Sequence, residues 1–213
     1  MPFENAYKIR TKRDNLFLRV SPGHFATSHS HINYFIDVTA QKTRLSEASA
    51  VAQELVSYYA STTIVDTILC LDGTQVIGTC LADELTKGNF INLNAHQTIY
   101  VLAPEYTSSS QIIFRDSVAP MITGKNVLIL AASVVTGYTA KSAIEAIKYY
   151  GGTVAGVASI FATVDNCMGY PVQSVFNPKD LSGYTSYFPH DCPLCRAGKK
   201  IDALVNSFGY SKL

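Results

Sequence analysis

Apolar and polar positions alternate along the middle of the chain in patterns typical of helices and strands. Apolar side chains recur at helical spacing in residues 46–59, 76–85 and 140–150, which predicts three amphipathic helices. Nearly continuous apolar runs at 126–132 and 153–161 are typical of strands buried on both faces of a parallel sheet. Helices and strands therefore follow one another in turn along this segment.

Shorter signals complete the pattern. Residues 64–71 are β-branched and apolar and lead into an Asp72-Gly73 turn, and residues 98–102 form a further short strand pattern. The β-α-β order implies an α/β fold, with a central, mostly parallel sheet flanked by helices and joined by right-handed crossovers.

The two ends of the chain are aromatic and irregular by comparison. We expect residues 1–40 and 165–213 to form a small hood over one edge of a core that spans about 45–163. With 213 residues, the chain is long enough for one sizeable core, and we expect a single domain over 1–213.

Composition excludes several classes of protein. Hydrophobic residues make up 47% of the chain and charged residues 15%, which excludes a disordered protein. A net charge of +1 gives no overall attraction to nucleic acid or to an anionic membrane. No apolar run approaches the roughly 18 residues of a spanning helix, and the polar start lacks the apolar core of a signal peptide. We expect a cytoplasmic protein with no nucleic-acid or membrane partner.

The strand at 126–132 runs through a short loop, Thr136-Gly137-Tyr138-Thr139, directly into a helix. Backbone N–H groups of such a loop and helix start, with two threonine hydroxyls, suit a phosphate at the carboxyl end of a parallel strand. The candidate phosphate-binding residues are Ser133, Val135, Thr136, Gly137, Tyr138 and Thr139. Neither GxxxxGK[ST] nor GxGxxG is present, so nucleoside-triphosphatase and dinucleotide sites lose their main support. The alternative is an ordinary strand-to-helix turn with Thr139 as the N-cap.

This stretch resembles the signature of the type I phosphoribosyltransferases, most closely the orotate phosphoribosyltransferases. That signature is a buried strand, two acidic residues, two mostly apolar residues, a Thr-Thr-Gly-Gly-Thr-like loop and a helix. Residues 127–130 match the strand and 135–139 match the loop. Residues 28–38 resemble the N-terminal segment of orotate enzymes, and residues 71–82 resemble their pyrophosphate-loop strand and helix.

The resemblance implies a type I phosphoribosyltransferase fold and a homodimer. It also implies transfer of phosphoribosyl from phosphoribosyl pyrophosphate to a pyrimidine base, with Mg²⁺. The residues placed around the base or ribose are Tyr34, Phe35, Asp72, Gly73, Ala131, Ala132 and Asn166.

The chain departs from the family pattern at its charged positions. Ala131 and Ala132 occupy the places of the acidic pair, and Asp72 stands where the pyrophosphate loop carries a lysine. Thr27 and Asn166 replace the lysine and arginine expected to grip the orotate carboxylate.

The segment that matches the mobile catalytic loop, residues 102–106, also lacks a cation, and Arg115 is the nearest candidate. The missing acids and lysines are groups that commonly contribute roughly 2–4 kcal/mol each to transition-state stabilisation. We therefore expect a phosphoribosyltransferase-like protein with weak or altered activity. The alternative is a non-catalytic regulatory or structural dimer that binds a phosphorylated ribose or a nucleoside monophosphate.

Five cysteines at scattered spacing and no secretory signal predict reduced thiols. Cys192-Pro-Leu-Cys195 has the spacing of a zinc-knuckle turn, so Cys192 and Cys195 are candidate Zn²⁺ ligands. His190 is a candidate third ligand, and the same pair in a partner subunit is another way to complete the site. The alternative is a proline-containing turn that starts a final helix over 199–208. The histidines at 24, 29 and 31 show no ligand spacing.

Overall fold

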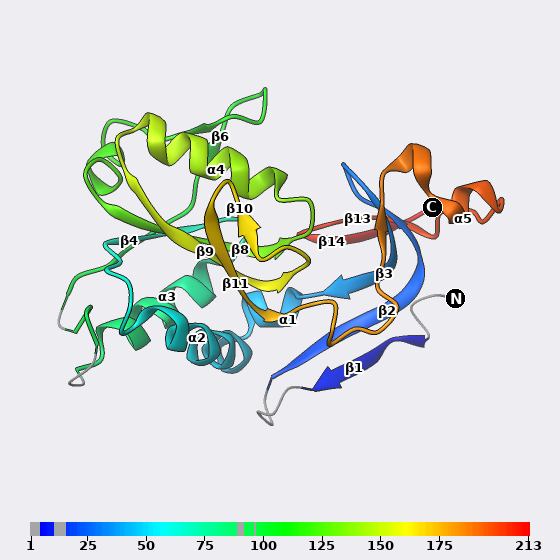
Figure 1. Ribbon diagram of the computed structural model, residues 1–213, viewed down its shortest axis with the longest axis horizontal. Helices are drawn as coiled ribbons and strands as arrows, with labels where there is room; N and C mark the ends of the chain where they lie inside the picture. The colour runs from blue at the N-terminus through cyan, green and yellow to red at the C-terminus, as the bar shows by residue number, and fades with distance from the viewer. Residues whose placement is uncertain (1–4, 11–15, 89–91, 96) are drawn as a thin grey trace.

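The computed structural model describes residues 5–10, 16–88, 92–95 and 97–213. Its strands form two six-stranded sheets and one small hairpin. Figure 1 shows the larger, helix-flanked core on the left and the second sheet, the hood, on the right.

The core sheet has the strand order β10-β11-β9-β8-β4-β5. Five of these strands run parallel, and only β10 pairs antiparallel to its neighbour, so the expected mostly parallel sheet is confirmed. In this order, the strands are β10 (Asn166–Cys167), β11 (Tyr170–Phe176), β9 (Thr153–Ala162), β8 (Asn126–Val134), β4 (Thr67–Cys70) and β5 (Tyr100–Leu102).

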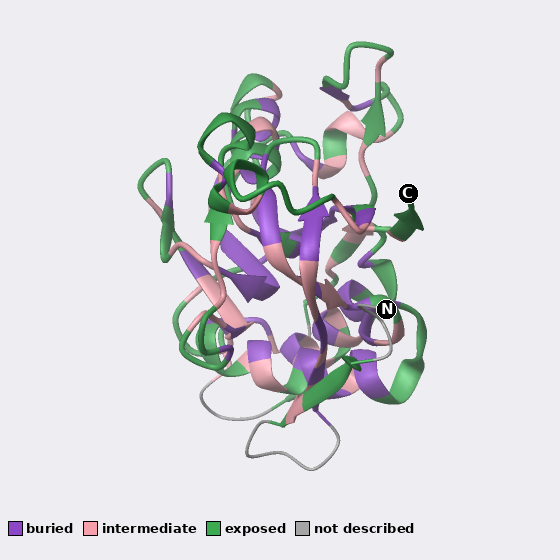
Figure 2. Cartoon of the chain, turned by 90° about the vertical axis from the view of Figure 1, so that its right-hand side faces the viewer, coloured by how far each residue is buried: buried purple, intermediate pink, exposed green. Residues whose placement is uncertain are grey.

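Both faces of the core sheet are covered by helices, as buried apolar runs require. Alternate residues of β8 pack into different clusters: Leu128 and Leu130 face α2 (Leu45–Tyr59) and α3 (Gln75–Thr86). Val127 and Ile129 face α4 (Tyr138–Tyr149) on the other side. Figure 2 shows the resulting purple interior between green outer surfaces.

The predicted helices over 46–59, 76–85 and 140–150 correspond to α2, α3 and α4 within one or two residues at each end. The last of them ends where Gly151 adopts a left-handed conformation, with φ of +76°, as expected of a glycine that follows a helix. Smaller elements lie between and after these: α1 (Thr39–Thr43), η2 (Ala119–Met121), η3 (Pro189–Asp191), and the antiparallel pair β6 (Glu105–Tyr106) and β7 (Ile112–Ile113).

The hood sheet has the order β12-β3-β2-β13-β14, with β1 also paired to β2. It therefore combines strands from both ends of the chain, which lie side by side in Figure 1. The strands are β1 (Tyr7–Arg10), β2 (Phe17–Ala26), β3 (His31–Asp37), β12 (Ser186–Tyr187), β13 (Ala203–Asn206) and β14 (Gly209–Lys212).

Two expectations for the C-terminal part are wrong. Residues 166–176 do not belong to the hood, because β10 and β11 complete the core sheet beside β9. Residues 199–208 do not form a helix: β13 alternates buried Ala203 and Val205 with exposed Leu204 and runs parallel to β2. The helix that follows Cys192 is α5 (Pro193–Arg196), which is only four residues long. Sheet pairing with a strand about 180 residues earlier prevails over the weak helical pattern there.

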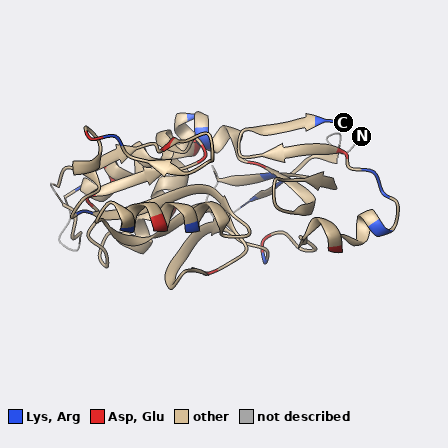
Figure 3. Ribbon diagram, turned by 90° about the horizontal axis from the view of Figure 1, so that it is seen from above, with Lys and Arg blue, Asp and Glu red and all other residues tan. Residues whose placement is uncertain are grey.

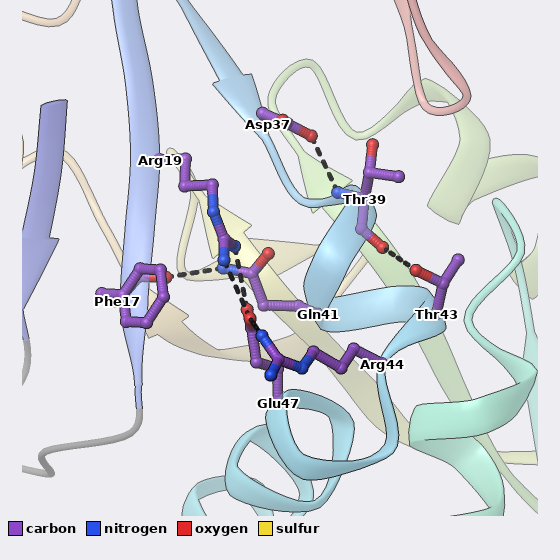
Figure 4. Close-up of polar contacts among 8 residues, drawn as sticks. All are labelled: Phe17, Arg19, Asp37, Thr39, Gln41, Thr43, Arg44 and Glu47. Atoms are coloured by element: carbon purple, nitrogen blue, oxygen red, sulfur yellow. Dashed lines mark hydrogen bonds and ion pairs between the residues drawn. The ribbon is translucent and has the colours of Figure 1, made fainter. Parts of the chain in front are cut away.

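A polar cluster joins the hood to the core where β2 passes the start of α2 (Figure 4). The Arg19 guanidinium donates two hydrogen bonds of 2.8 Å to the Glu47 carboxylate. Gln41 donates to the Phe17 carbonyl oxygen at 2.7 Å. The hydrogen bonds from Arg19 hold the pKa of Glu47 below its ordinary value, so the pair is a stable link between the two parts.

Charged side chains are interspersed in sign over the rest of the molecule, as Figure 3 shows from above. No helix of the described residues is long and apolar enough to cross a membrane.

Candidate functional site

A cavity of about 270 Å³ lies between the carboxyl end of β8, the start of α4 and the hood. The structure brings all six candidate phosphate-binding residues to its wall: Ser133, Val135, Thr136, Gly137, Tyr138 and Thr139. Ligands of open α/β sheets bind at this edge, outside the carboxyl ends of the strands.

The loop at the end of β8 is held in place by its neighbours. The Thr163 hydroxyl donates to the Val135 carbonyl oxygen at 2.6 Å. The Gly137 carbonyl oxygen accepts from the Lys141 N–H at 2.8 Å and from the Cys167 thiol at 3.7 Å. Gly137 has φ of +74° and is itself the N-cap, so the alternative in which Thr139 caps the helix is wrong.

The side chains of this loop remain available to a ligand. The hydroxyls of Thr136 and Thr139 have no hydrogen-bond partner within the described part of the chain, and both residues are exposed. The first N–H groups of a helix have no carbonyl within the helix to bond. Loop and helix start thus present neutral donors to an anion.

Asp72 stands at the other side of the cavity, in the turn after β4. Asp72 and Gly73 have φ of +57° and +78°, so both are left-handed. Burial raises the pKa of the Asp72 carboxyl, while the Ala132 N–H and the Ser207 hydroxyl, which bond to it, act in the opposite direction. A carboxyl group therefore lies against position 132 although residue 132 is an alanine.

Lys42, which the sequence analysis missed, lies behind this turn. Its ammonium donates to the Asp72 carbonyl oxygen at 2.8 Å and also to the Ser207 carbonyl oxygen. Burial lowers the pKa of Lys42, and the charges of Asp72 and Asp37 act in the opposite direction. Nothing in the sequence around Lys42 indicates this role, because the two carbonyl oxygens that it bonds belong to distant segments of the chain.

The residues proposed around a base or ribose divide into two groups. Phe35, Asp72 and Ala132 line the cavity. The other four are not among its lining residues: Tyr34, Gly73, Ala131 and Asn166.

The structure gives reasons for this division. Ala131 faces the α4 side of the sheet, opposite to Ala132. Tyr34 packs against the α2 and α3 cluster. Asn166 accepts a hydrogen bond from the Gly169 N–H in the turn between β10 and β11.

The hood supplies lining residues that the sequence analysis did not assign to the site. Ser28 and His29, in the loop between β2 and β3, border the cavity, as do Asn206 at the end of β13 and Ser207 directly after it. The His29 ring lies 4.8 Å from the Tyr138 ring, centroid to centroid.

Cations are scarce at this site. No lysine or arginine lines the cavity within the described residues, and Asp72 is the one acid there. Arg115, the nearest candidate in the sequence, lies on the surface and makes a two-pronged ion pair with Glu105. Mg²⁺ is a hard cation that prefers oxygen ligands, and alanines at 131 and 132 supply none from their side chains. Asp72 therefore supplies the one side-chain carboxyl among the described lining residues, and no lysine or arginine there faces a diphosphate.

The Cys-Pro-Leu-Cys turn lies in the hood, away from this cavity. Cys192 and Cys195 are brought together with His24 and His31, two histidines in which the sequence showed no ligand spacing. His190 does not join them: it is exposed and pairs with Asp191 at 3.1 Å.

The comparisons with known proteins agree with this architecture. No family model matches the chain. The chain is 29% identical to the orotate phosphoribosyltransferase of Chlorobaculum parvum over 186 residues, which cover 85% of this chain and 86% of that protein.

Among solved structures, the UMP synthase of Leishmania donovani aligns with a TM-score of 0.54 and 20% identity, over 76% of this chain and 34% of that one. The adenine phosphoribosyltransferase of Trypanosoma brucei, in complex with AMP, pyrophosphate and ribose-5-phosphate, aligns with a TM-score of 0.51 and 14% identity. That alignment covers 84% of this chain and 89% of the other. The chain thus has the type I phosphoribosyltransferase fold, and its sequence resembles that of an orotate phosphoribosyltransferase.

Proposed function

We propose that this phosphoribosyltransferase-like protein binds a 5′-phosphorylated ribose, as a nucleoside monophosphate, and does not carry out ordinary orotate transfer. One observation carries the proposal. The cavity offers uncharged hydrogen-bond donors for a phosphate and one carboxyl group, but no lysine or arginine within the described residues. The 5′-phosphate is placed on residues 136–139, where backbone N–H groups and hydroxyls can donate to it.

The carboxyl of Asp72 supports a ribose beside that phosphate. It lies next to Ala132, at the strand position where the family resemblance places an acid. A carboxyl oxygen accepts hydrogen bonds from ribose hydroxyls. Asp72 is thus proposed to take over, from a different loop, the role of the missing acid.

The same carboxyl disfavours a diphosphate. A pyrophosphate group directed at the turn after β4 would meet Asp72 instead of a lysine side chain. The Lys42 ammonium lies there, but it already bonds two carbonyl oxygens and is 5% exposed. Repulsion between the Asp72 carboxylate and the negatively charged pyrophosphate opposes binding of this leaving group. Catalysis of phosphoribosyl transfer depends on stabilising that group.

A second candidate is phosphoribosyl transfer with altered chemistry. Two observations favour it. The Lys42 ammonium group lies at the turn after β4, and the sequence is 29% identical to the Chlorobaculum parvum enzyme. It requires binding of Mg²⁺ and phosphoribosyl pyrophosphate together. A homodimer is a further expectation that both candidates share.

Calorimetric titration separates the candidates. We expect uridine or orotidine monophosphate to bind with or without Mg²⁺, and phosphoribosyl pyrophosphate to bind more weakly than either. Tight, Mg²⁺-dependent binding of phosphoribosyl pyrophosphate would favour the enzyme instead. Binding of none of these ligands would leave a purely structural role and contradict the proposal.

The Ala132→Asp variant is the informative gain-of-function control, since Ala132 lines the cavity. If the altered enzyme exists, adding this carboxylate should increase Mg²⁺-dependent binding of phosphoribosyl pyrophosphate. Under our proposal the second acid beside Asp72 weakens diphosphate binding further. Ala131→Asp is a poor choice because residue 131 faces the α4 side of the sheet and does not line the cavity.

A further inference from the structure

We propose that His24, His31, Cys192 and Cys195 form a Cys₂His₂ zinc site in the hood. The four side chains come from β2, β3 and the turn around α5, and all four candidate ligand atoms lie within 4.8 Å of one another. The site lies outside the cavity described above and does not depend on the function proposed for it.

Four of the six distances between ligand atoms are close to the edges of a tetrahedron around zinc. With Zn–S of about 2.3 Å and Zn–N of about 2.05 Å, tetrahedral geometry places sulfur and nitrogen about 3.6 Å apart and two nitrogens about 3.3 Å apart. His24 Nε2 lies 3.5 Å from Cys192 Sγ and 3.6 Å from Cys195 Sγ. His31 Nδ1 lies 3.2 Å from Cys195 Sγ and 3.3 Å from His24 Nε2.

The tautomer of His24 favours a cation over a set of hydrogen bonds. Its Nδ1 lies 2.9 Å from the Lys199 carbonyl oxygen and 3.2 Å from that of Lys200, so Nδ1 carries the proton and donates. Nε2 then holds a lone pair, and three polar atoms converge on it within 3.6 Å. One lone pair accepts one hydrogen bond well, whereas a single cation satisfies all four atoms. Carbonyl oxygens on the second ring nitrogen are also the usual outer partners of metal-bound histidines.

Burial agrees with a closed structural site. His24 is fully buried, Cys192 and His31 are buried, and Cys195 is the exposed member through which an ion can enter. Four protein ligands leave no open position for catalysis, and two thiolates with two imidazoles select zinc among the available metals. The site needs no ligand from a partner subunit.

The site ties together parts of the hood that are far apart in the sequence. His24 in β2 and His31 at the start of β3 flank the hairpin loop that borders the cavity, and Cys192 is 168 residues from His24. The His24 backbone also bonds Asp202 in both directions, at 2.7 Å each. A bound zinc ion therefore joins the β2–β3 hairpin to the segment that leads into β13.

The first test is metal analysis of the full-length protein purified without chelators. We expect one zinc per chain, and replacement by Co²⁺ should give the intense visible bands and the thiolate-to-cobalt charge transfer of tetrahedral coordination. Protein that binds neither metal stoichiometrically, or that is isolated with a Cys192–Cys195 disulfide, would overturn the proposal.

Matched variants assign the ligands. Cys195→Ser and His31→Asn should weaken zinc binding at least 100-fold in competition with a chromophoric chelator. Cys80→Ser, a thiol outside the cluster, and His190→Asn, the other histidine near the turn, should leave it unchanged. Equal losses in His190→Asn and Cys195→Ser would contradict the assignment.

A measurement on the unmodified chain does not depend on the folding of any variant. Zinc removal by a chelator should increase hydrogen exchange in β2, β3 and β13 while leaving β8 and β9 protected. Unchanged exchange in the hood, or equal loosening of both sheets, would contradict a zinc site that joins these hood strands.

Discussion

At the scale of single residues, the chemistry of the cavity depends on where carboxyl and ammonium groups lie. Asp72 brings a carboxyl to the wall beside Ala132, and Lys42 lies behind it with its ammonium bonded to carbonyl oxygens. The two alanines of the sequence motif are not equivalent, since only Ala132 faces the cavity.

The first prediction concerns the charge of Asp72. Asp72→Asn should raise the affinity for inorganic pyrophosphate by roughly tenfold, or about 1–2 kcal/mol, because a like charge is removed. Asparagine tolerates the left-handed conformation found at this position, so the turn should be retained. Calorimetric titration measures the change. Asp116→Asn, an exposed acid outside the cavity, is the control, and equal affinities in the three proteins would refute the role of Asp72.

The second prediction concerns the phosphate loop. Thr136→Val removes a hydroxyl with no partner in the described structure and should lower the affinity for uridine monophosphate by about tenfold, roughly 1.4 kcal/mol. Thr79→Val, an exposed threonine on α3, should have no effect. Calorimetric titration of both variants with uridine monophosphate measures the change in affinity. An unchanged affinity in Thr136→Val would count against a phosphate at this loop.

At the scale of elements, close packing between helices and the core sheet determines how the strand ends are presented. Gly78 of α3 lies directly over β4 and β5: a Cβ atom there would lie 2.3 Å from Cys70 Sγ and 3.2 Å from Val101 Cγ1. Thr74, just before α3, donates its hydroxyl to the Leu71 and Leu130 carbonyl oxygens. The turn that carries Asp72 is thus supported on both sides.

The third prediction follows from this close approach. Gly78→Ala should lower the free energy of unfolding by about 1–3 kcal/mol through overpacking, although Gly→Ala in an exposed helix position gains about 1 kcal/mol. Thr79→Ala, at the neighbouring exposed position, should be neutral or slightly stabilising. Urea denaturation followed by circular dichroism measures both. A stabilised Gly78→Ala protein would show that helix and sheet have room to separate.

At the scale of the whole molecule, polar contacts link the hood to the helix-flanked core. The Arg19–Glu47 pair joins β2 of the hood to α2 of the core, with the Glu47 side chain 7% exposed. The pKa of Glu47 lies below its ordinary value, principally through the hydrogen bonds from Arg19.

The fourth prediction is a pH dependence of stability. Because the folded-state pKa of Glu47 is lowered, its contribution is fully present above the ordinary glutamate pKa of about 4.3 and is lost as pH falls through the folded value. Glu47→Gln should therefore cost about 1–3 kcal/mol at neutral pH and progressively less under acid conditions. Glu145→Gln, which breaks an exposed pair with Lys141, should cost little at any pH. Denaturation at several pH values tests this, and a cost that does not shrink toward acid pH would exclude the mechanism.

The sequence by itself determined those elements whose signal is local. The helices α2, α3 and α4 follow from a side-chain period of 3.6, and the strands β8 and β9 follow from nearly continuous apolar runs. The sequence also placed the loop at residues 135–139 at the carboxyl end of a parallel strand, because a buried strand runs directly into a helix there, and this loop lines the cavity.

Only the tertiary structure decided which residues far apart in the sequence meet. Lys42 meets Ser207, 165 residues away, and His24 meets Cys192, 168 residues away. The strand at Ala203–Asn206 exists because β2 offers it an edge to pair with. Contacts of this kind depend on how the chain closes on itself, and no local pattern of residues encodes them.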